Sequence, residues 1–212
     1  MMLRTATHAV LGHARRNGLA REELVHHMAA ASRTWTIDDV HALPDDGNRY
    51  EVIDGELFVT PAPSLVHQRA VFELAGLLRD YLAPQHFAEV LIGPADVVFS
   101  PGRAVQPDLF VLPLIAGRRA KAFADVGRLL LAVEVLSTST ARADRVHKRR
   151  LYREERVGEY WIIDLDARVI ERSTPADPRV DVFGDMLTWR PDEASAPFTF
   201  GVVDYLQRVL DD

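Results

Sequence analysis

The sequence contains no cysteine. Disulfide bonds and zinc sites built from thiolates are therefore excluded, and any bound metal ion must be held by oxygen or imidazole ligands. Such ligands favour hard divalent cations over soft ones, so Mg²⁺ or Mn²⁺ is the cofactor that we expect if the protein binds a metal.

Long apolar runs are also missing, although 48% of the residues are hydrophobic. A membrane-spanning helix needs roughly 20 consecutive apolar residues, whereas the densest run, residues 129–136, is interrupted by Glu134. No secretory hydrophobic segment follows the first arginine. We therefore expect a soluble, cytoplasmic protein that does not enter a membrane.

The length of 212 residues is enough for one substantial hydrophobic core and too short for two full-sized domains. Residues 1–33 contain many arginine, alanine and histidine residues, and they precede the first regular hydrophobic pattern of the chain. We predict a helical extension over residues 1–34 and a single domain over residues 35–212.

Positive charge is scarce, because 31 acidic residues outnumber 25 basic ones and give a net charge of −6. A nucleic-acid function therefore cannot rest on a basic surface as a whole and would have to use local charge. The strongest local excess is residues 142–156, with seven basic side chains against three acidic ones. This segment is either a surface that contacts the DNA backbone or an exposed helix with ion pairs along its own length.

The chain reads as short strands alternating with helices. Asp54-Gly55 between two β-patterned runs predicts a tight hairpin, and Ser64 is placed to cap a helix that extends to Leu82. The expected strands are residues 50–53, 56–60, 88–92, 96–99, 108–112, 129–136, 160–164, 169–172, 180–183 and 186–189, and the other expected helices are residues 36–40, 143–156 and 202–210.

Glu134 lies within the most apolar strand. Alternate residues of a strand share a face, so Glu134 lies with Ala132 and Leu136 while Val133 and Val135 face the other side, and both faces are apolar. Burying a lone carboxylate there costs several kcal/mol unless a cation or hydrogen bonds compensate. We therefore expect a positive group to meet Glu134, either in a functional site or in an ion pair that serves the structure alone.

A second carboxylate and a lysine are candidates to join Glu134. Asp108 follows Pro107 at the start of an apolar strand, and the proline restricts the direction in which the strand begins. In the helix after Glu134, Asp144, Lys148 and Tyr152 share one face, so that Lys148 either points inward or belongs to a solvated face with its basic neighbours. Carboxylates that hold a metal and a cation that stabilises developing charge are parts of a phosphodiester hydrolase.

Six segments occur in series between Tyr50 and about Arg172: YEVIDGEL, PSLVHQ, QPDLFVL, LLLAVEVLSTST, DRVHK and YREERVGEYWIID. In order and spacing they resemble the Uma family of restriction-endonuclease-like proteins, a branch of the PD-(D/E)XK nuclease superfamily, over well more than half of the chain. The resemblance implies an α/β restriction-endonuclease-like fold, with a mixed central β-sheet flanked by helices and an N-terminal hairpin. It implies that Asp108 is the motif aspartate and Glu134 the motif acid.

One position departs from the superfamily pattern, which places a lysine two residues after the motif acid, where this sequence has Leu136. The resemblance implies that the lysine has moved to the following helix as Lys148. It also implies a further metal ligand, Glu56, although Glu51 on the same face of the hairpin is not distinguished from it. His67 matches the histidine of the family and either assists water or phosphate or packs its helix as a structural residue.

Together these residues predict an endonuclease that uses Mg²⁺ or Mn²⁺ to hydrolyse phosphodiester bonds in DNA. The expected metal ligands are Asp108 and Glu134, with Glu56 as a further candidate. Lys148 and His67 join the two acids as expected catalytic residues. A homodimer is expected, because cutting both strands of a duplex favours two sites related by symmetry. The alternatives are a non-catalytic DNA- or protein-binding module on the nuclease scaffold and a hydrolase of other phosphate esters with a smaller pocket.

Overall fold

The computed structural model describes residues 33–191 and 195–210. The helical extension predicted for residues 1–34 lies almost wholly outside this part of the chain, so the predicted division into extension and domain stays a prediction. The chain from Trp35 onward forms one unit. Among the described residues, no helix is both long enough and apolar enough to cross a membrane.

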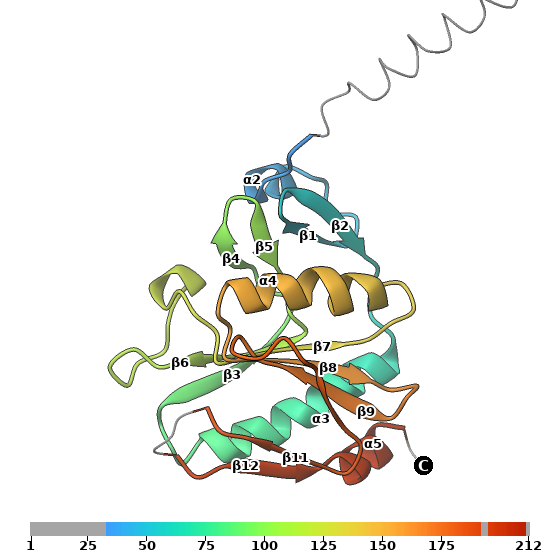
Figure 1. Ribbon diagram of the computed structural model, residues 1–212. Coiled ribbons are helices and arrows are strands. Elements are labelled where there is room, and N and C mark those ends of the chain that lie inside the picture. Colours follow the sequence, from blue (N-terminus) through green and yellow to red (C-terminus); the bar gives the residue numbers. More distant parts are fainter. Residues whose placement is uncertain (1–32, 192–194, 211–212) are drawn as a thin grey trace, which may run out of the picture. The chain divides into compact units, whose positions relative to one another are not determined.

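A six-stranded mixed sheet forms the centre of this unit (Figure 1). In spatial order it consists of β10 (Asp181–Phe183), β9 (Val169–Ser173), β8 (Glu159–Asp164), β7 (Leu131–Val135), β6 (Leu109–Pro113) and β3 (Ala88–Ile92). The central pair β7 and β8 is parallel, and the other neighbours are antiparallel. Successive residues of β7 enter two different hydrophobic cores, with Val133 in one and Ala132 in the other, so both faces of the sheet are buried.

One face of the sheet is covered by α3 (Leu65–Leu82), α5 (Val202–Leu210) and the hairpin of β11 (Met186–Trp189) and β12 (Phe198–Gly201), which Figure 1 shows below the sheet. The N-terminus of α3 is capped by the Ser64 hydroxyl, which accepts a hydrogen bond from the His67 backbone N–H at 3.2 Å. Apolar residues at spacings of three and four then bury one side of α3. The buried positions are His67, Ala70, Val71, Leu74, Leu78 and Leu82.

The other face is covered by the π-helix η2 (Ala143–Lys148) and by α4 (Arg149–Glu154), which together connect β7 to β8. A second sheet contains β2 (Glu56–Thr60), β1 (Arg49–Ile53), β5 (Arg103–Val105) and β4 (Val97–Ser100) in that order. Two short helices complete the described part: α2 (Ile37–His41), capped by Thr36, and the 3₁₀ turn η1 (Phe123–Asp125). Figure 1 shows α4 above the six-stranded sheet, with the second sheet beyond it.

The predicted elements are present with bounds that differ by a few residues at most, and the mixed α/β architecture is confirmed. Two strands lack a signal in the sequence: β5 is only three residues long, and β12 is recognisable as a strand through its pairing with β11. The segment predicted as one helix over residues 143–156 begins with six π-helical residues and ends two residues early.

Candidate active site

A cavity of about 650 Å³ lies where β6 begins and β7 ends. Since these strands are antiparallel neighbours, the start of one lies beside the end of the other. The residues that line it include Asp108, Glu134, Lys148 and His67, together with Arg49 of β1. Four of the five residues predicted for the site are thus brought together by the fold.

Asp108 directly precedes β6, and hydrogen-bond donors surround its carboxylate. Oδ1 accepts a hydrogen bond from Arg49 Nη1 at 2.8 Å. Oδ2 accepts one from the Val135 backbone N–H at 2.9 Å and lies 2.9 Å from His67 Nε2. The contact with Val135 holds Asp108 against the end of β7, one residue after Glu134.

The positive group expected beside Glu134 is Lys148. Glu134 Oε1 lies 2.9 Å from Lys148 Nζ and accepts a hydrogen bond from the Tyr152 hydroxyl at 3.3 Å. The same ammonium group lies 2.8 Å from Glu51 Oε2 and 3.5 Å from Asp144 Oδ1. Lys148 is only 5% exposed and points at three carboxylates instead of solvent.

The backbone of η2 positions Lys148. A π-helix closes its hydrogen bonds over five residues instead of four, which widens the turn, and such turns are frequent at functional sites. The backbone N–H of Arg149 accordingly bonds to the carbonyl of Asp144. Asp144 and Lys148 are both buried in η2, as the predicted shared face requires.

Glu51 and Glu56, which the sequence left as alternatives, have different positions relative to the site. Glu56 pairs with Ile53, and Glu51 lies two residues before Ile53 on the same face of β1. Glu51 is buried against Lys148, whereas Glu56 is exposed beside the turn and is not one of the described residues that line the cavity. The hairpin acid at the site is therefore Glu51, and the structure does not bring Glu56 there.

The sequence pattern and this geometry agree with the similarity to known proteins. Residues 37–193 match Uma2, a family described as "Putative restriction endonuclease". The chain belongs to the Uma2 family. The resemblance inferred from the six sequence segments is thereby confirmed at the level of the family. No curated protein matches the chain.

A solved structure has a similar fold. It is described as "a putative nuclease belonging to DUF820" from Anabaena variabilis ATCC 29413. The match has a TM-score of 0.65 and 19% sequence identity, and it covers 82% of the Uma2-family chain described here and 98% of the Anabaena chain. At this level of identity the likeness concerns the fold, and the chemistry must be argued from the side chains.

Asp108 is held as an anion in this member of the Uma2 family. Burial alone would raise the pKa of Asp108, but the hydrogen bond and charge of His67, the charge of Arg49 and the backbone N–H of Val135 lower that pKa below its ordinary value. The carboxylate is therefore available as a negatively charged ligand.

Glu134 and Lys148 respond to burial in different ways. Burial raises the pKa of Glu134 well above its ordinary value; Lys148 opposes this change, and the neighbouring carboxylates add to it. Burial alone would lower the pKa of Lys148, but Glu134, Glu51 and Asp144 raise that pKa well above its ordinary value. Lys148 is therefore held as an ammonium ion.

Two carboxylates of this Uma2-family site are of the ligand type that a hard divalent cation accepts. Within residues 33–191 and 195–210, no group of three or more His, Asp or Glu side chains is arranged to hold a metal ion. Mg²⁺, however, usually keeps several waters and binds proteins through one or two carboxylates together with substrate phosphates. Asp108 and Glu134 line one cavity and supply such oxygens. Asp108 pairs with Arg49, and Glu134, Glu51 and Asp144 lie around Lys148.

The basic segment is more strongly paired than its sequence indicates. Arg145 and Arg149 pair with Glu171 of β9, and Arg145 also pairs with Asp164. Arg150 pairs with Asp54 of the hairpin turn. Of the ion pairs along the helix that one of the two alternatives expects, Lys148 with Asp144 is present. The arginines named here pair instead with neighbouring strands and turns, because η2 and α4 pack on the sheet.

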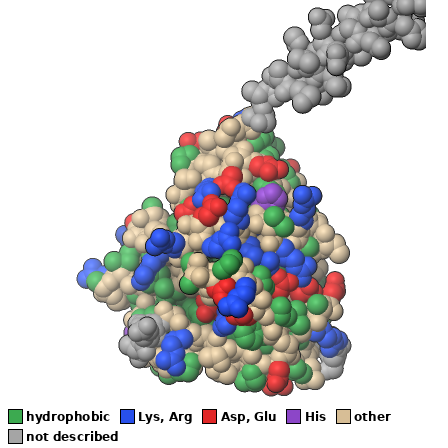
Figure 2. Space-filling model, viewed as in Figure 1, with side chains coloured by type: hydrophobic (Ala, Val, Ile, Leu, Met, Phe, Trp, Pro, Cys, Tyr) green, Lys and Arg blue, Asp and Glu red, His purple; other side chains and the backbone are tan. Residues whose placement is uncertain are grey.

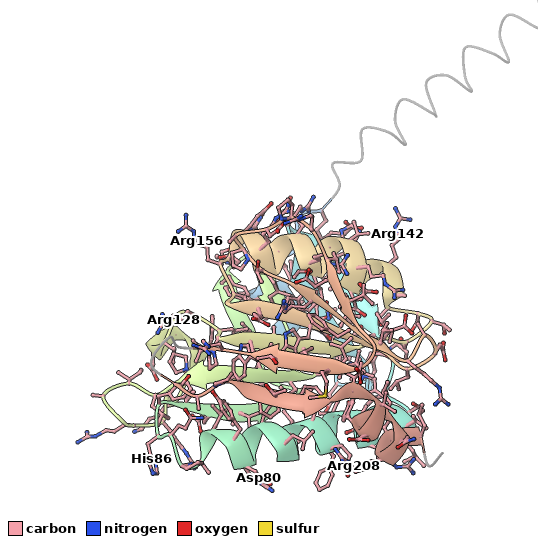
Figure 3. The ribbon with its side chains drawn as sticks, turned by 60° about the horizontal axis from the view of Figure 1, so that its bottom comes forward. Asp80, His86, Arg128, Arg142, Arg156 and Arg208 are labelled. Carbon is pink, nitrogen blue, oxygen red and sulfur yellow. The ribbon has the colours of Figure 1, made fainter. Side chains whose placement is uncertain are left out.

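Four arginines of the segment are exposed, namely Arg142, Arg150, Arg153 and Arg156, and of these Arg150 pairs with Asp54. Figure 2 shows Lys and Arg side chains gathered over α4 with acidic side chains beside them. Figure 3 places Arg142 and Arg156 at opposite ends of the helix formed by η2 and α4, both directed outward. Arg142 follows Ala141, which lines the cavity, so the end with Arg142 is the one beside the candidate site.

Two contacts of the site are not predicted from the sequence. Arg49 directly precedes the YEVIDGEL segment, and its spacing of two from Glu51 places both side chains on one face of β1. That spacing is the available signal, but it does not reveal Asp108 as the partner. The sequence places Tyr152 on the face of Lys148 without indicating that its hydroxyl reaches Glu134.

Proposed function

We propose that this Uma2-family protein is a divalent-cation-dependent endonuclease of the PD-(D/E)XK type that hydrolyses phosphodiester bonds in DNA. The observation that carries the proposal is the convergence of Asp108, Glu134 and Lys148 on one cavity at adjoining strand ends. These are the motif acids and the displaced lysine that the family pattern implies. A restriction-endonuclease-like core accords with the mixed sheet and its βαβ crossover through η2 and α4.

In this proposal Asp108 and Glu134 hold Mg²⁺ or Mn²⁺. When bound, such a cation activates water and neutralises charge on the phosphodiester. Lys148 fixes the direction of Glu134 and presents a positive charge to the reacting phosphate. His67 holds Asp108 through Oδ2. Glu51 supports the site by binding Lys148. In this proposal Glu51 therefore replaces Glu56 as the acid that the hairpin contributes.

The substrate proposed for the site is DNA in the cytoplasm, with a phosphate contacted by the exposed Arg142 beside the cavity. A homodimer accords with the cutting of both strands, since two copies related by symmetry present two sites. Sedimentation of the full chain with and without a DNA duplex measures this: a single monomeric species in both conditions would contradict the homodimer and leave a nicking enzyme.

A second candidate is a binding module that retains the scaffold without turnover. One observation favours it: each acid already has a protein cation, with Arg49 at Asp108 and Lys148 at Glu134. Such a site is stable without a metal ion. The two candidates differ in whether a divalent cation changes what the protein does to DNA.

Plasmid nicking distinguishes them. Supercoiled plasmid is incubated with the full chain and Mg²⁺ or Mn²⁺, and nicked product is quantified for the wild type, Glu134→Gln and the control Arg79→Gln. Arg79 is exposed on α3 and pairs with the adjacent Asp80. We expect nicking by the wild type and Arg79→Gln, and a loss of about 100-fold or more for Glu134→Gln and in EDTA. No nicking by the wild type, or equal nicking by Glu134→Gln, would support the binding module.

A further inference from the structure

Arg49 lies between two cavities. It lines the cavity of about 650 Å³ that contains Glu134 and Lys148, and it also lines an adjoining cavity of about 210 Å³. Asp108 and His67 line both cavities as well. The side chain of Arg49, which is 19% exposed, therefore borders open space in both cavities while its Nη1 contacts Asp108.

The two oxygens of Asp108 are held differently. Oδ2 is engaged by the Val135 backbone N–H and by His67 Nε2. Oδ1 is held by Arg49 Nη1 and by no other hydrogen-bond donor of the described residues. A cation that binds Asp108 through Oδ1 therefore competes with Arg49 and leaves the other two contacts in place.

Arg49 also has unused hydrogen-bonding capacity. Its Nε is buried and makes no hydrogen bond within the described part of the chain, and the same holds for His67 Nδ1. Buried polar atoms without partners are rare, and in a native protein they call for a ligand, water or ion. The five N–H groups of a guanidinium form a planar fork that matches two oxygens of a phosphate.

We propose that Arg49 is a phosphate-binding residue that exchanges partners: it occupies Asp108 Oδ1 in the cation-free protein and turns to a phosphate of the substrate when a divalent cation takes that oxygen. The inference rests on the proposed function, because it names how the same site receives its substrate. Arg49 acts in it first as a competitor of the cation and then as a ligand of the phosphodiester.

The exchange predicts that two affinities change in opposite directions in Arg49→Gln. Isothermal titration calorimetry with Mn²⁺ alone, on the full chain, should show binding tightened about tenfold, since about 1.4 kcal/mol of competition is removed. Arg49→Lys keeps a cation near Asp108 and should stay close to the wild type. Arg79→Gln is the matched arginine control and should not change the affinity for Mn²⁺.

Binding of DNA supplies the second measurement. Fluorescence anisotropy with a labelled 20-base-pair duplex and Ca²⁺, with a gel to verify that the duplex stays intact, should show affinity lowered about fivefold or more in Arg49→Gln. Arg49→Lys should fall between Arg49→Gln and the wild type, because a single point charge replaces a two-pronged contact. Thermal melting of each variant verifies that it is folded, and Arg49→Lys serves if Arg49→Gln does not fold.

Three outcomes would overturn the exchange: Mn²⁺ affinity lowered or unchanged in Arg49→Gln, DNA affinity unchanged in the presence of the cation, or no Mn²⁺ binding by the wild type and the variants. If Arg49→Gln does not fold, Arg49→Lys with DNA affinity equal to that of the wild type would also overturn it. A purely structural role for Arg49 predicts weaker Mn²⁺ binding, because Asp108 would lose its positioning. Failure of the proposed endonuclease is distinct, since it would appear as absent plasmid nicking even where the two affinities change as expected.

Discussion

At the scale of single residues, the arrangement of the site depends on Lys148. Its ammonium group contacts Glu134 and Glu51 at less than 3 Å and Asp144 at 3.5 Å, and all four side chains are buried. Removal of one partner from a buried charge network leaves uncompensated charges, which costs more than the network contributes as a whole. Lys148 is therefore a structural requirement of the site, whatever further role it has in catalysis.

Lys148→Met should lower the free energy of unfolding at pH 7 by about 3 to 5 kcal/mol, because three buried carboxylates lose their common cation. The loss should shrink toward pH 5, because burial raises the pKa of Glu134 and of Asp144 and a protonated carboxyl group needs no cation. Urea unfolding at both pH values measures this. Lys121→Met, at the other lysine of the chain, changes an exposed side chain and should stay within about 0.5 kcal/mol of the wild type.

The contribution of Glu134 to the free energy of unfolding should decrease as the pH rises. Because its pKa in the folded protein is raised well above the ordinary 4.5, the protonated form favours folding. This contribution is complete below about pH 4.5 and is lost as the pH rises through the folded value. Glutamine cannot ionise, so Glu134→Gln does not lose this contribution as the pH rises. In EDTA, the free energy of unfolding of Glu134→Gln relative to that of the wild type should therefore increase from pH 4.5 to pH 8.

Chemical unfolding at several pH values tests this expectation, with the exposed carboxylate of Glu56→Gln as the control. A stability difference between Glu134→Gln and the wild type that stays constant or decreases with pH would contradict it. Addition of Mn²⁺ should then stabilise the wild type but not Glu134→Gln, since a ligand that binds only the folded state raises its stability.

At the scale of elements, the close approach of β7 and β8 depends on a glycine. Gly158 lies directly before β8, and a Cβ placed on it would meet the backbone carbonyl oxygen of Leu130 at 2.5 Å. The parallel pairing of the two strands begins beside this contact, with Leu131 opposite Glu159. A side chain here would separate the strand that carries Glu134 from the strand that supports it.

Gly158→Ala should therefore destabilise the protein by about 1 to 3 kcal/mol, the range found for overpacked sites. Gly76→Ala is the matched control: Gly76 lies in α3, nothing lies within 4 Å of an added Cβ, and alanine should stabilise the helix by about 0.5 to 1 kcal/mol. Differential scanning calorimetry of the two variants compares the changes. A Gly158→Ala protein as stable as the wild type would contradict this prediction, because it would show that β7 and β8 move apart without a loss in the free energy of unfolding.

At the scale of the whole molecule, binding of DNA must depend on local positive charge, because the net charge of −6 does not attract phosphates. Ion pairs from η2 and α4 to neighbouring strands and turns neutralise part of the basic segment. Arg142, Arg153 and Arg156, which are exposed and form no ion pair within the described residues, lie toward its two ends. Phosphate contacts appear in the salt dependence of DNA binding, with a slope of about 0.9 for each contact. A variant that lowers this slope therefore identifies an arginine that contacts a phosphate.

Arg142→Gln should weaken binding of a DNA duplex and lower the salt slope by about 0.9, because Arg142 lies at the end of the helix beside the cavity. Arg156→Gln, at the opposite end, makes the same chemical change away from that cavity and should have a smaller effect. Anisotropy titrations between low and moderate salt compare the two. Equal effects would indicate that the DNA lies along the whole helix, and no effect from either would remove this surface from the proposal.

The sequence by itself determined most of the elements, and the family resemblance implied the motif acids. Local patterns sufficed for the Asp54-Gly55 hairpin, the capped helix α3 and the buried strand of Glu134, since turn, cap and periodicity signals act between near neighbours in the chain. The need of Glu134 for a cation also followed from the sequence, because a carboxylate between two apolar faces cannot stay unpaired. Lys148 was the candidate for that cation, and its ammonium group lies 2.9 Å from Glu134 Oε1.

Only the tertiary structure decided which distant side chains meet. Arg49 and Asp108 are 59 positions apart, and Glu51 and Lys148 are 97 apart; no periodicity relates such positions. Glu51 and Glu56 share a strand face, and the packing of η2 against β1 makes only Glu51 a partner of Lys148. Contacts of this kind depend on the register and crossing of whole elements, which long-range packing fixes and local sequence does not.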